Sequence, residues 1–311
     1  MKKVFIDGSA GTTGLRIKER LAARDDIELM QIDSELRKDN DERKKMLNSC
    51  DIAFLCLPDD AAREAVAMID NPEVVVFDTS TAHRTNEDWT YGFAELSEKS
   101  FDNIKSSKRI AVPGCHASGF IALVYPLIEA GILPKDALLT CHSITGYSGG
   151  GKKMIADYEA EEPAQELAAP RQYGIAQQHK HLKEMKAITG IDNAPVFSPI
   201  VAPFYSGMQV TVPLFTSQLN PGFGIEDIKK IYADKYTGPL VTYNAELENG
   251  GFIASNALSY KDSMNIAAYG NEDRIILVAV YDNLGKGASG AAIECMNINM
   301  GADITKGLDV V

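Results

Sequence analysis

The sequence predicts an α/β protein with two domains: a parallel-sheet domain, and an α+β domain whose sheet is mixed or antiparallel. Short apolar segments alternate with helical patterns over roughly the first 115 residues, which is typical of a parallel sheet. After about residue 129 the apolar segments lengthen and partly alternate with polar residues, which indicates the second kind of sheet. A chain of 311 residues is long enough for two such domains.

Composition excludes several classes of protein. The net charge of −12 argues against nucleic acid or an anionic membrane as a partner, because both require a basic face. No apolar run reaches the ~18 residues that a membrane span needs. The chain starts directly with a strand pattern, so we expect a cytoplasmic protein. Its five cysteines are widely spaced and show no metal-ligand pattern, so we predict no metal site.

A glycine-rich loop follows the first predicted strand, Val4–Asp7, and precedes a helical pattern over 15–21. Strand, loop and helix in this order are the setting of a Rossmann-type dinucleotide site, in which the backbone approaches a pyrophosphate at the helix start. The glycine spacing is G-x-x-G-x-x-G. The alternative to a dinucleotide site is a glycine-rich turn that only packs the helix on the strand. The predicted cofactor-binding residues of the loop are Gly8, Ser9, Gly11, Thr12, Thr13 and Gly14.

The end of the second predicted strand, Ile27–Ile32, carries both acidic and basic residues. Asp33 is of the type that binds the ribose hydroxyls of NAD, whereas Ser34, Arg37 and Lys38 could hold the 2′-phosphate of NADP. This pattern favours NADP only slightly. A solvated charged loop is the alternative for Lys38.

Three further apolar segments, 51–58, 73–77 and 109–112, read as parallel strands, with a helix over 59–68. Ligands bind beyond the carboxyl ends of such strands. We therefore expect one cleft to be lined by the residues that follow these ends, namely Gly8, Asp33, Pro58, Ser80 and Cys115.

Cys115 follows Pro113-Gly114 and precedes an apolar helical pattern. The unpaired N–H groups at a helix start favour a thiolate, so Cys115 is the predicted nucleophile. The other cysteines, Cys50, Cys56, Cys141 and Cys295, lie in apolar stretches and are interpreted as packing residues.

A cysteine nucleophile needs a side chain that takes up and returns protons, and the chain has five histidines that could do so. His181 and Glu184 are three residues apart and would share a helix face, so the glutamate could orient the imidazole. Alternatively, His179 and His181 are exposed helix residues without a catalytic role. These two histidines would face differently on a helix, which disfavours a metal site. The side chain of His116 is expected to diverge from that of Cys115.

The second half of the chain contains two more glycine-rich segments. Residues 146–153 could bind an anion through backbone N–H groups and Lys152, or could be a mobile surface loop. Residues 283–290 end a strand and open a last helix over 291–300. A thiolate in a dinucleotide crevice suggests one chemistry: the sulfur attacks an activated acyl group, and the resulting thioester accepts hydride while an imidazole handles the proton.

Eight motifs together resemble one known family, the short form (type 2) of N-acetyl-gamma-glutamyl-phosphate reductase. They span nearly the whole chain and are GSAGTTGL at 8–15, RKD at 37–39, CLPDDAA at 56–62, DTSTAHRT at 78–85, PGCHA at 113–117, GYSGGGK at 146–152, HKHL at 179–182 and DNLGKGASG at 282–290. The resemblance implies NADPH-dependent reduction of N-acetyl-γ-glutamyl phosphate to N-acetylglutamate 5-semialdehyde and inorganic phosphate, in arginine biosynthesis. It also implies a semialdehyde dehydrogenase-like fold and a homo-oligomer, dimer or tetramer.

The resemblance also implies roles for individual residues. Cys115 would carry the thioester, His181 with His179 and Glu184 would serve acid–base or substrate-binding roles, and Asn283 would contact the nicotinamide amide. The last helix would return to the NADP-binding domain, so that residues 1–115 and 285–311 form one domain and 116–284 form the catalytic, substrate-binding and oligomerisation domain. The predicted substrate-binding residues are Arg84, Ser148, Gly149, Lys152 and Arg171. The two arginines are candidates for a bidentate grip on the substrate carboxylate.

The sequence departs from the family pattern at three places: Ala94, Lys183 and the Glu294-Cys295 pair. None of them touches the nucleophile. The nearest rival function is another acyl-phosphate reductase, of the aspartate-semialdehyde dehydrogenase kind, which would share the cysteine and the cofactor. A rival of another class is a non-catalytic NADPH or redox sensor that uses Cys115 as its sensing thiol.

Overall fold

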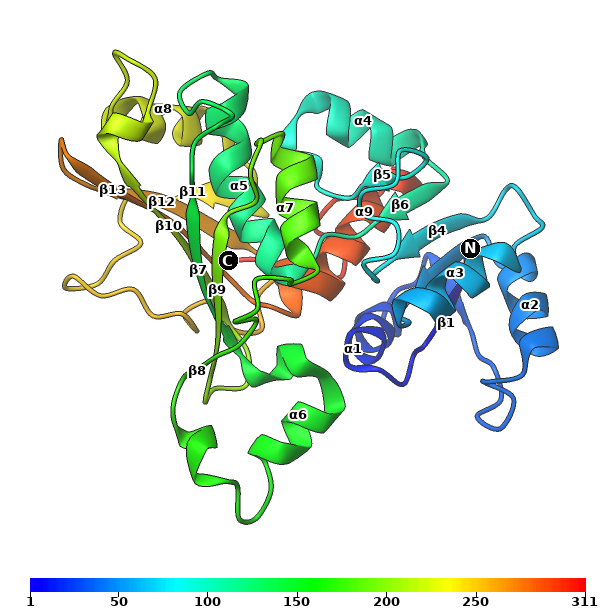
Figure 1. Cartoon of the computed structure of the whole chain (residues 1–311). Helices are drawn as coiled ribbons and strands as arrows, with labels where there is room; N and C mark the ends of the chain where they lie inside the picture. The colour runs from blue at the N-terminus through cyan, green and yellow to red at the C-terminus, as the bar shows by residue number, and fades with distance from the viewer. The chain divides into compact units, whose positions relative to one another are not determined.

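The computed structural model describes all 311 residues and divides them into two compact units. The first unit contains Met1–Gly114 and Ala288–Leu308, and the second contains Cys115–Gly287 and Asp309–Val311. The predicted fold class is confirmed, since the first unit has an all-parallel sheet and the second a mixed sheet (Figure 1). None of the helices is long and apolar enough to cross a membrane.

The sheet of the first unit has the strand order β2-β1-β3-β4-β6-β5. Its strands are β1 (Lys2–Asp7), β2 (Ile27–Met30), β3 (Ile52–Leu55), β4 (Val75–Asp78), β5 (Thr90–Tyr91) and β6 (Arg109–Ala111). Its helices are α1 (Thr12–Leu21), α2 (Asn40–Ser49), α3 (Asp59–Ala67), α4 (Glu98–Ser106) and α9 (Gly290–Met300).

Both faces of this sheet are buried, which explains its continuous apolar strands. Val4 and Ile6 pack on one face with buried residues of α1, α4 and α9, whereas Phe5 packs on the other with residues of α2 and α3. The last helix therefore supplies part of the core of a domain that otherwise comes from the first third of the chain. All carboxyl ends of the paired strands lie at one edge of the sheet.

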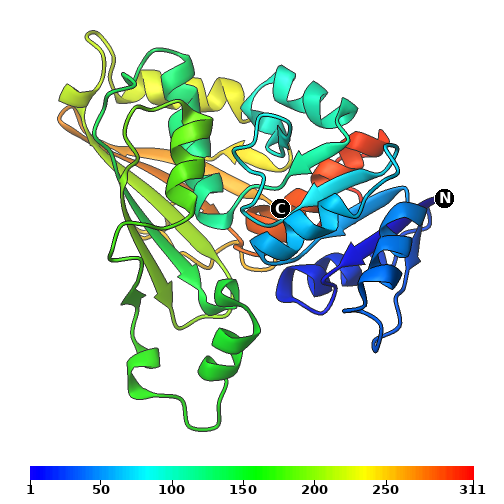
Figure 2. The same cartoon turned by 45° about the vertical axis from the view of Figure 1, so that its right-hand side comes forward.

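The sheet of the second unit has the order β11-β12-β13-β10-β7-β9-β8 and is mixed. Its strands are β7 (Thr140–Gly146), β8 (Arg171–Gln172), β9 (Val196–Ala202), β10 (Met208–Phe215), β11 (Val241–Tyr243), β12 (Met264–Gly270) and β13 (Arg274–Tyr281). Its helices are α5 (Cys115–Glu129), α6 (Gly151–Tyr158), α7 (His181–Thr189) and α8 (Ile225–Lys235). Figure 2 shows α5 and α7 together against this sheet.

Helix α5 is the buried centre of the second unit. Eleven of its residues are buried, from His116 to Leu127. Pro126 lies inside the helix and lacks the N–H that would bond the carbonyl of Ala122. The hydroxyl of Tyr236 donates to that carbonyl at 2.6 Å instead, so the interrupted backbone keeps a partner.

Candidate functional site

The glycine loop of the first unit is shaped by close backbone contact. Gly8 has a φ of +85°, and a Cβ atom there would lie 2.3 Å from the carbonyl oxygen of Cys56. A Cβ atom at Gly14 would lie 2.5 Å from the carbonyl oxygen of Gly8. Only glycine fits at these two positions, because the loop folds back on itself and on the end of β3.

This loop has the features that a pyrophosphate requires. Gly11 caps α1 without any side-chain hydrogen bond, so the first N–H groups of the helix are not covered by a capping side chain. The hydroxyl oxygen of Thr12 is buried and has no hydrogen-bond partner within the protein. A phosphate oxygen at the helix start would satisfy both, so the residues present fit the phosphates of a dinucleotide.

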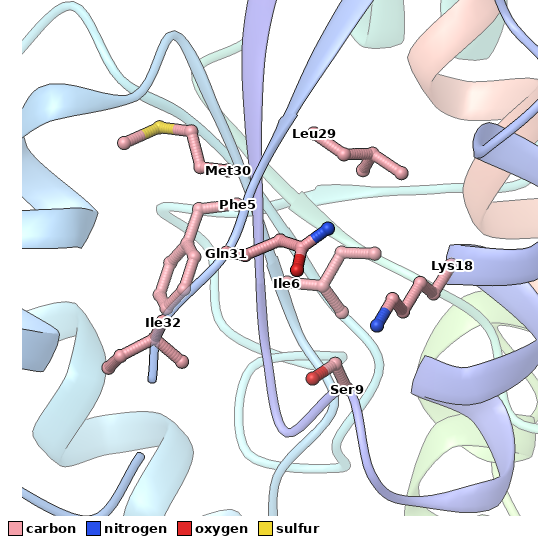
Figure 3. Close-up of a pocket in the computed structure, with 8 residues that line it drawn as sticks. All are labelled: Phe5, Ile6, Ser9, Lys18, Leu29, Met30, Gln31 and Ile32. Atoms are coloured by element: carbon pink, nitrogen blue, oxygen red, sulfur yellow. The ribbon is translucent and has the colours of Figure 1, made fainter. Parts of the chain in front are cut away.

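A cavity of about 60 Å³ adjoins the loop between the ends of β1 and β2 (Figure 3). Ser9, Gln31 and Lys18 supply its polar groups. Lys18 lies one helical turn beyond Gly14 on α1, and that spacing is the signal in the sequence from which it could have been predicted.

The remaining predicted cofactor residues of this unit also follow strand ends. Ser34, Arg37 and Lys38 lie in the exposed turn after β2, in which Asp33 accepts a hydrogen bond from the backbone N–H of Glu35 at 3.1 Å. Pro58 caps α3 after β3.

Ser80 lies after β4, where its hydroxyl donates to Asp78 at 2.7 Å. The same carboxylate lies 2.6 Å from Nδ1 of His83, whose ring stacks on Trp89. These contacts give His83 a structural role in the first unit.

Arg84 is buried in the first unit and is held by backbone carbonyls. Its Nε donates to Val112 at 2.9 Å and its Nη2 donates to Thr79 at 2.8 Å. These bonds join the segments that follow β4 and β6. These hydrogen bonds give Arg84 a structural role and do not by themselves support a role in substrate binding.

Cys115 begins helix α5 and is half-buried, with no acidic residue in the first turn of the helix. The Tyr281 hydroxyl bridges this first turn, because it donates to the carbonyl of Cys115 and accepts from the N–H of Gly119 at 3.0 Å. Gly287 packs against the nucleophile, since a Cβ atom there would lie 3.1 Å from that of Cys115. The position of the thiol is therefore fixed from two sides.

The other thiols have environments that suit packing. Burial raises the pKa of Cys50 and Cys56 to about 12. Cys141 and Cys295 are fully buried.

Three histidines gather at the start of α5. The ring of His116 lies 5.8 Å from that of His179 and 5.6 Å from that of His181, centroid to centroid. The ring of His116, which directly follows Cys115 in the chain, belongs to this cluster. His179 and His181 lie 4.8 Å apart, although a helix would separate them, because α7 begins at His181 and His179 precedes it.

His181 and Glu184 are both buried on the first turn of α7, three residues apart as predicted, so the exposed alternative is wrong for His181. Burial and the nearby charge of Lys180 lower the pKa of His179, while Glu184 acts in the opposite direction. No group of three or more histidine, cysteine or carboxylate side chains is arranged to hold a metal ion.

Tyr173 and Ser143 belong to this cluster and were missed from the sequence. His116 lies 2.6 Å from the hydroxyl of each, through Nδ1 to Ser143 and Nε2 to Tyr173. An isolated tyrosine and a strand serine carry no motif, so only their place in the fold marks them. Arg171 lies two residues before Tyr173 and therefore on the same side of the extended chain.

The glycine loop of the second unit is more ordered than a mobile loop. Ser148 is buried, and its hydroxyl accepts from Asn283 Nδ2 at 3.0 Å. Asn283 also accepts from the N–H of Gly207 at 2.9 Å, so its amide is engaged on both sides. Gly149 lies beside this amide, whereas Lys152 is exposed on α6.

Known proteins place this fold in one class. Residues 4–104 match the family described as semialdehyde dehydrogenase, NAD binding domain, and residues 115–283 match semialdehyde dehydrogenase, dimerisation domain. Among solved structures, aspartate semialdehyde dehydrogenase II of Vibrio cholerae, complexed with ASA, has a TM-score of 0.71 over 97% of this chain and 98% of its own, at 16% identity. Aspartate semialdehyde dehydrogenase with NADP from Candida albicans has a TM-score of 0.65 over 98% and 99%, at 17% identity.

Relatives with higher sequence identity identify the family within this class. N-acetyl-gamma-glutamyl-phosphate reductase of Sinorhizobium medicae is 45% identical over 96% of this chain and 99% of its own length. N-acetyl-gamma-glutamyl-phosphate reductase 2 of Nostoc is 43% identical over 98% and 99%. The chain therefore belongs to the N-acetyl-gamma-glutamyl-phosphate reductase family of semialdehyde dehydrogenases, which confirms the resemblance.

Proposed function

We propose that this protein reduces N-acetyl-γ-glutamyl phosphate with NADPH to N-acetylglutamate 5-semialdehyde and phosphate. The observation that carries the proposal is a half-buried cysteine at a helix start with three histidines gathered beside it, in a member of this reductase family. A packing cysteine would need neither feature.

The cofactor-binding residues are those that follow the strand ends of the first unit. Gly8, Ser9, Gly11, Thr12, Thr13 and Gly14 would hold the pyrophosphate at the start of α1. Ser34, Arg37 and Lys38 would hold the 2′-phosphate, and Pro58 and Ser80 would line the crevice. Asn283 would contact the nicotinamide amide with the second N–H and the second lone pair of its side-chain amide, because Ser148 and Gly207 use only one of each.

The chain's own groups account for the chemistry before and after hydride transfer. The sulfur of Cys115 attacks the acyl carbon, so that a carbon–sulfur bond forms and the bond to the phosphate oxygen breaks. NADPH, held by the residues of the first unit named above, would supply the hydride that the reduction requires. The carbon–sulfur bond then breaks, and the thiolate leaves as the aldehyde forms. His181 or His179, oriented from α7, holds the proton that these steps exchange.

Arg171 is the stronger candidate for the substrate carboxylate. Its Nε is buried without a hydrogen-bond partner, and its Nη2 donates to the Tyr158 hydroxyl at 3.1 Å. A carboxylate would give the guanidinium the bidentate partner that it lacks. The Ser148–Gly149 turn and Lys152 would complete the binding region. The proposal also includes release of inorganic phosphate, a homo-oligomer and a cytoplasmic location.

One experiment separates this function from the nearest alternative. Purified protein is given NADP, phosphate and either N-acetylglutamate semialdehyde or aspartate semialdehyde, and NADPH formation is followed. We expect turnover of the acetylated substrate. A preference for aspartate semialdehyde would contradict the proposal, and NADPH binding without turnover of either substrate would favour a redox sensor.

A further inference from the structure

Two short hydrogen bonds join three side chains of the second unit into a line. Nδ1 of His116 on α5 lies 2.6 Å from the hydroxyl of Ser143 on β7, and Nε2 lies 2.6 Å from the hydroxyl of Tyr173. Ser143 is fully buried and His116 is 3% exposed. The line therefore begins in the core and ends at Tyr173, which is 36% exposed.

The burial of the Ser143 hydroxyl determines the direction of both hydrogen bonds. The hydroxyl of Ser143 has no other hydrogen-bond partner than His116, and a buried donor without an acceptor is costly. Ser143 therefore donates to Nδ1 of His116. A neutral imidazole carries one N–H, which must then be on Nε2, and this group donates to the oxygen of Tyr173. The hydroxyl hydrogen of Tyr173 remains for another acceptor.

Both rings keep the protonation states that this arrangement needs. Burial, together with the neighbouring His179, lowers the pKa of His116 to about 3, so its imidazole is neutral at physiological pH. Burial raises the pKa of Tyr173, and the charge of a Cys115 thiolate raises it further. Tyr173 is thus a protonated hydroxyl, and it is hydrogen-bonded to His116, the residue that directly follows Cys115 at the start of α5.

The position of His116 is also fixed by packing. Its ring meets the ring of Phe197 edge-on at 5.4 Å and that of His179 at 5.8 Å. The backbone N–H of Tyr173 donates to the carbonyl of Pro199 at 3.0 Å, which anchors the tyrosine to β9. A donor held in this way needs little reorganisation during a reaction.

We propose that the Ser143–His116–Tyr173 line aims the Tyr173 hydroxyl as a hydrogen-bond donor at the oxygen of the acyl group carried by Cys115. That oxygen gains negative charge when the carbonyl becomes tetrahedral, so the bond strengthens in the transition state. Tyr173 is then a catalytic residue, and His116 and Ser143 are positioning residues. The inference rests on the proposed reductase function.

Steady-state kinetics of Tyr173→Phe test the donor. Loss of one preorganised donor of this kind lowers kcat about 100-fold, and we expect KM for N-acetyl-γ-glutamyl phosphate to change by less than about threefold. Tyr269→Phe on β12, a matched change whose hydroxyl bonds the carbonyl of Ala245, should keep wild-type kinetics. A kcat for Tyr173→Phe within about threefold of wild type would overturn the proposal.

Substitutions of His116 test the positioning role. His116→Leu removes both hydrogen bonds and should lower kcat as much as Tyr173→Phe does. His116→Gln keeps an acceptor and a donor and should recover at least about tenfold of that loss. In the Tyr173→Phe background the His116→Leu change should have little further effect on kcat. A full additional loss in that background would show that His116 acts by another route.

If His116→Leu does not fold, a measurement on the unmutated protein without substrate still tests the proposal. Nitrogen-15 NMR of labelled histidines should show His116 as the neutral ring protonated on Nε2, and Ser143→Ala should weaken that preference. A ring protonated on Nδ1 would overturn the proposal. An unmutated protein without turnover would contradict the reductase function itself, whereas active protein with active Tyr173→Phe would contradict only the inference.

Discussion

At the scale of single residues, Cys115 differs from the other cysteines both by its neighbours in the sequence and by its place in the fold. It begins a helix and is half-buried, and Tyr281 and Gly287 fix its backbone and Cβ. Burial raises the pKa of Cys50 and Cys56, which favours the neutral thiol that packing requires. A helix start instead favours the thiolate, which is the basis for predicting Cys115 as the nucleophile.

We predict that Cys115→Ser abolishes reduction while NADPH binding persists. A serine hydroxyl is a weaker nucleophile at neutral pH, and the alkoxide is a poor leaving group. The kcat should fall by on the order of 10⁴-fold or more. NADPH oxidation measures the first property and NADPH fluorescence the second. Near-normal activity would exclude the thioester route.

Arg37→Ala should weaken NADPH far more than NADH. The guanidinium lies in the exposed turn after β2, where it can pair with a 2′-phosphate that NADH lacks. Loss of such a charged hydrogen bond corresponds to about a tenfold higher Kd for NADPH. Titration with both nucleotides checks this, with Lys99→Ala on the exposed side of α4 as a control. An equal loss for both nucleotides would remove Arg37 from cofactor selection.

At the scale of elements, α5 is a helix that three tyrosine hydroxyls stabilise. Tyr236 and Tyr232 each donate at 2.6 Å to backbone carbonyls near Pro126, those of Ala122 and Leu123, and Tyr281 bridges the first turn. The carbonyl of Ala122 is the one that Pro126 leaves without its helical partner. Helix α5 is thus held by Tyr232 and Tyr236, at the C-terminal end of α8, and by Tyr281 of β13.

Gly119→Ala tests this at the catalytic end of α5. An added Cβ would lie 2.6 Å from Val210 Cγ2 and 2.7 Å from the Tyr281 hydroxyl, so the first turn must move. We expect unfolding free energy to fall by about 1–3 kcal/mol and kcat to fall with it. Urea unfolding and NADPH oxidation give the two values.

Gly238→Ala is the matched control for this substitution. A Cβ at Gly238 meets nothing within 4 Å, and the residue has no positive φ. This variant should keep wild-type stability and activity. Wild-type behaviour of Gly119→Ala as well would show that the start of α5 tolerates displacement.

At the scale of the whole molecule, the chain returns to its first unit at its C-terminal end. Arg24 is the centre of this return: it binds Asp26 through two hydrogen bonds, of 2.9 and 2.7 Å, and donates to the side chain of Asn297 on α9. Lys306 lies 3.2 Å from the same aspartate. Residues far apart in the sequence therefore share one charged network within the unit.

The network predicts an acid-sensitive contribution to stability. Hydrogen bonds from Arg24, and the nearby Lys306, lower the pKa of Asp26. A carboxylate whose folded pKa is lowered stabilises the protein fully above its unfolded value of about 3.9, and this contribution is lost as the pH falls further. Asp26→Asn should cost about 1 kcal/mol at pH 7 and about half of that at pH 2.5, because pH 2.5 lies between the unfolded and the folded pKa of Asp26.

Urea unfolding at the two pH values measures the difference. Asp60→Asn is the control, because Asp60 forms only a surface pair with Arg63 on the same helix. An Asp26→Asn variant with the same cost at both pH values would show that its hydrogen bonds, and not its charge, hold the returning segment.

The sequence by itself determined the fold class and predicted the nucleophile. Apolar periodicity and the glycine loop depend on local chemistry, so β1, α1 and the helix start at Cys115 could be read directly from neighbouring residues. Continuous apolar strands also indicated a sheet buried on both faces. Weakly patterned elements such as α8 and β12 were missed, because packing against α5 and β13 defines them more than their own sequence does.

Only the tertiary structure decided which side chains gather at the start of α5. His116 is hydrogen-bonded to Ser143 and Tyr173, which lie 27 and 57 residues later in the chain. His179 and His181 lie close together because a helix begins between them. The physical reason is that hydrogen bonds between distant residues depend on strand order and helix packing, which no local pattern contains.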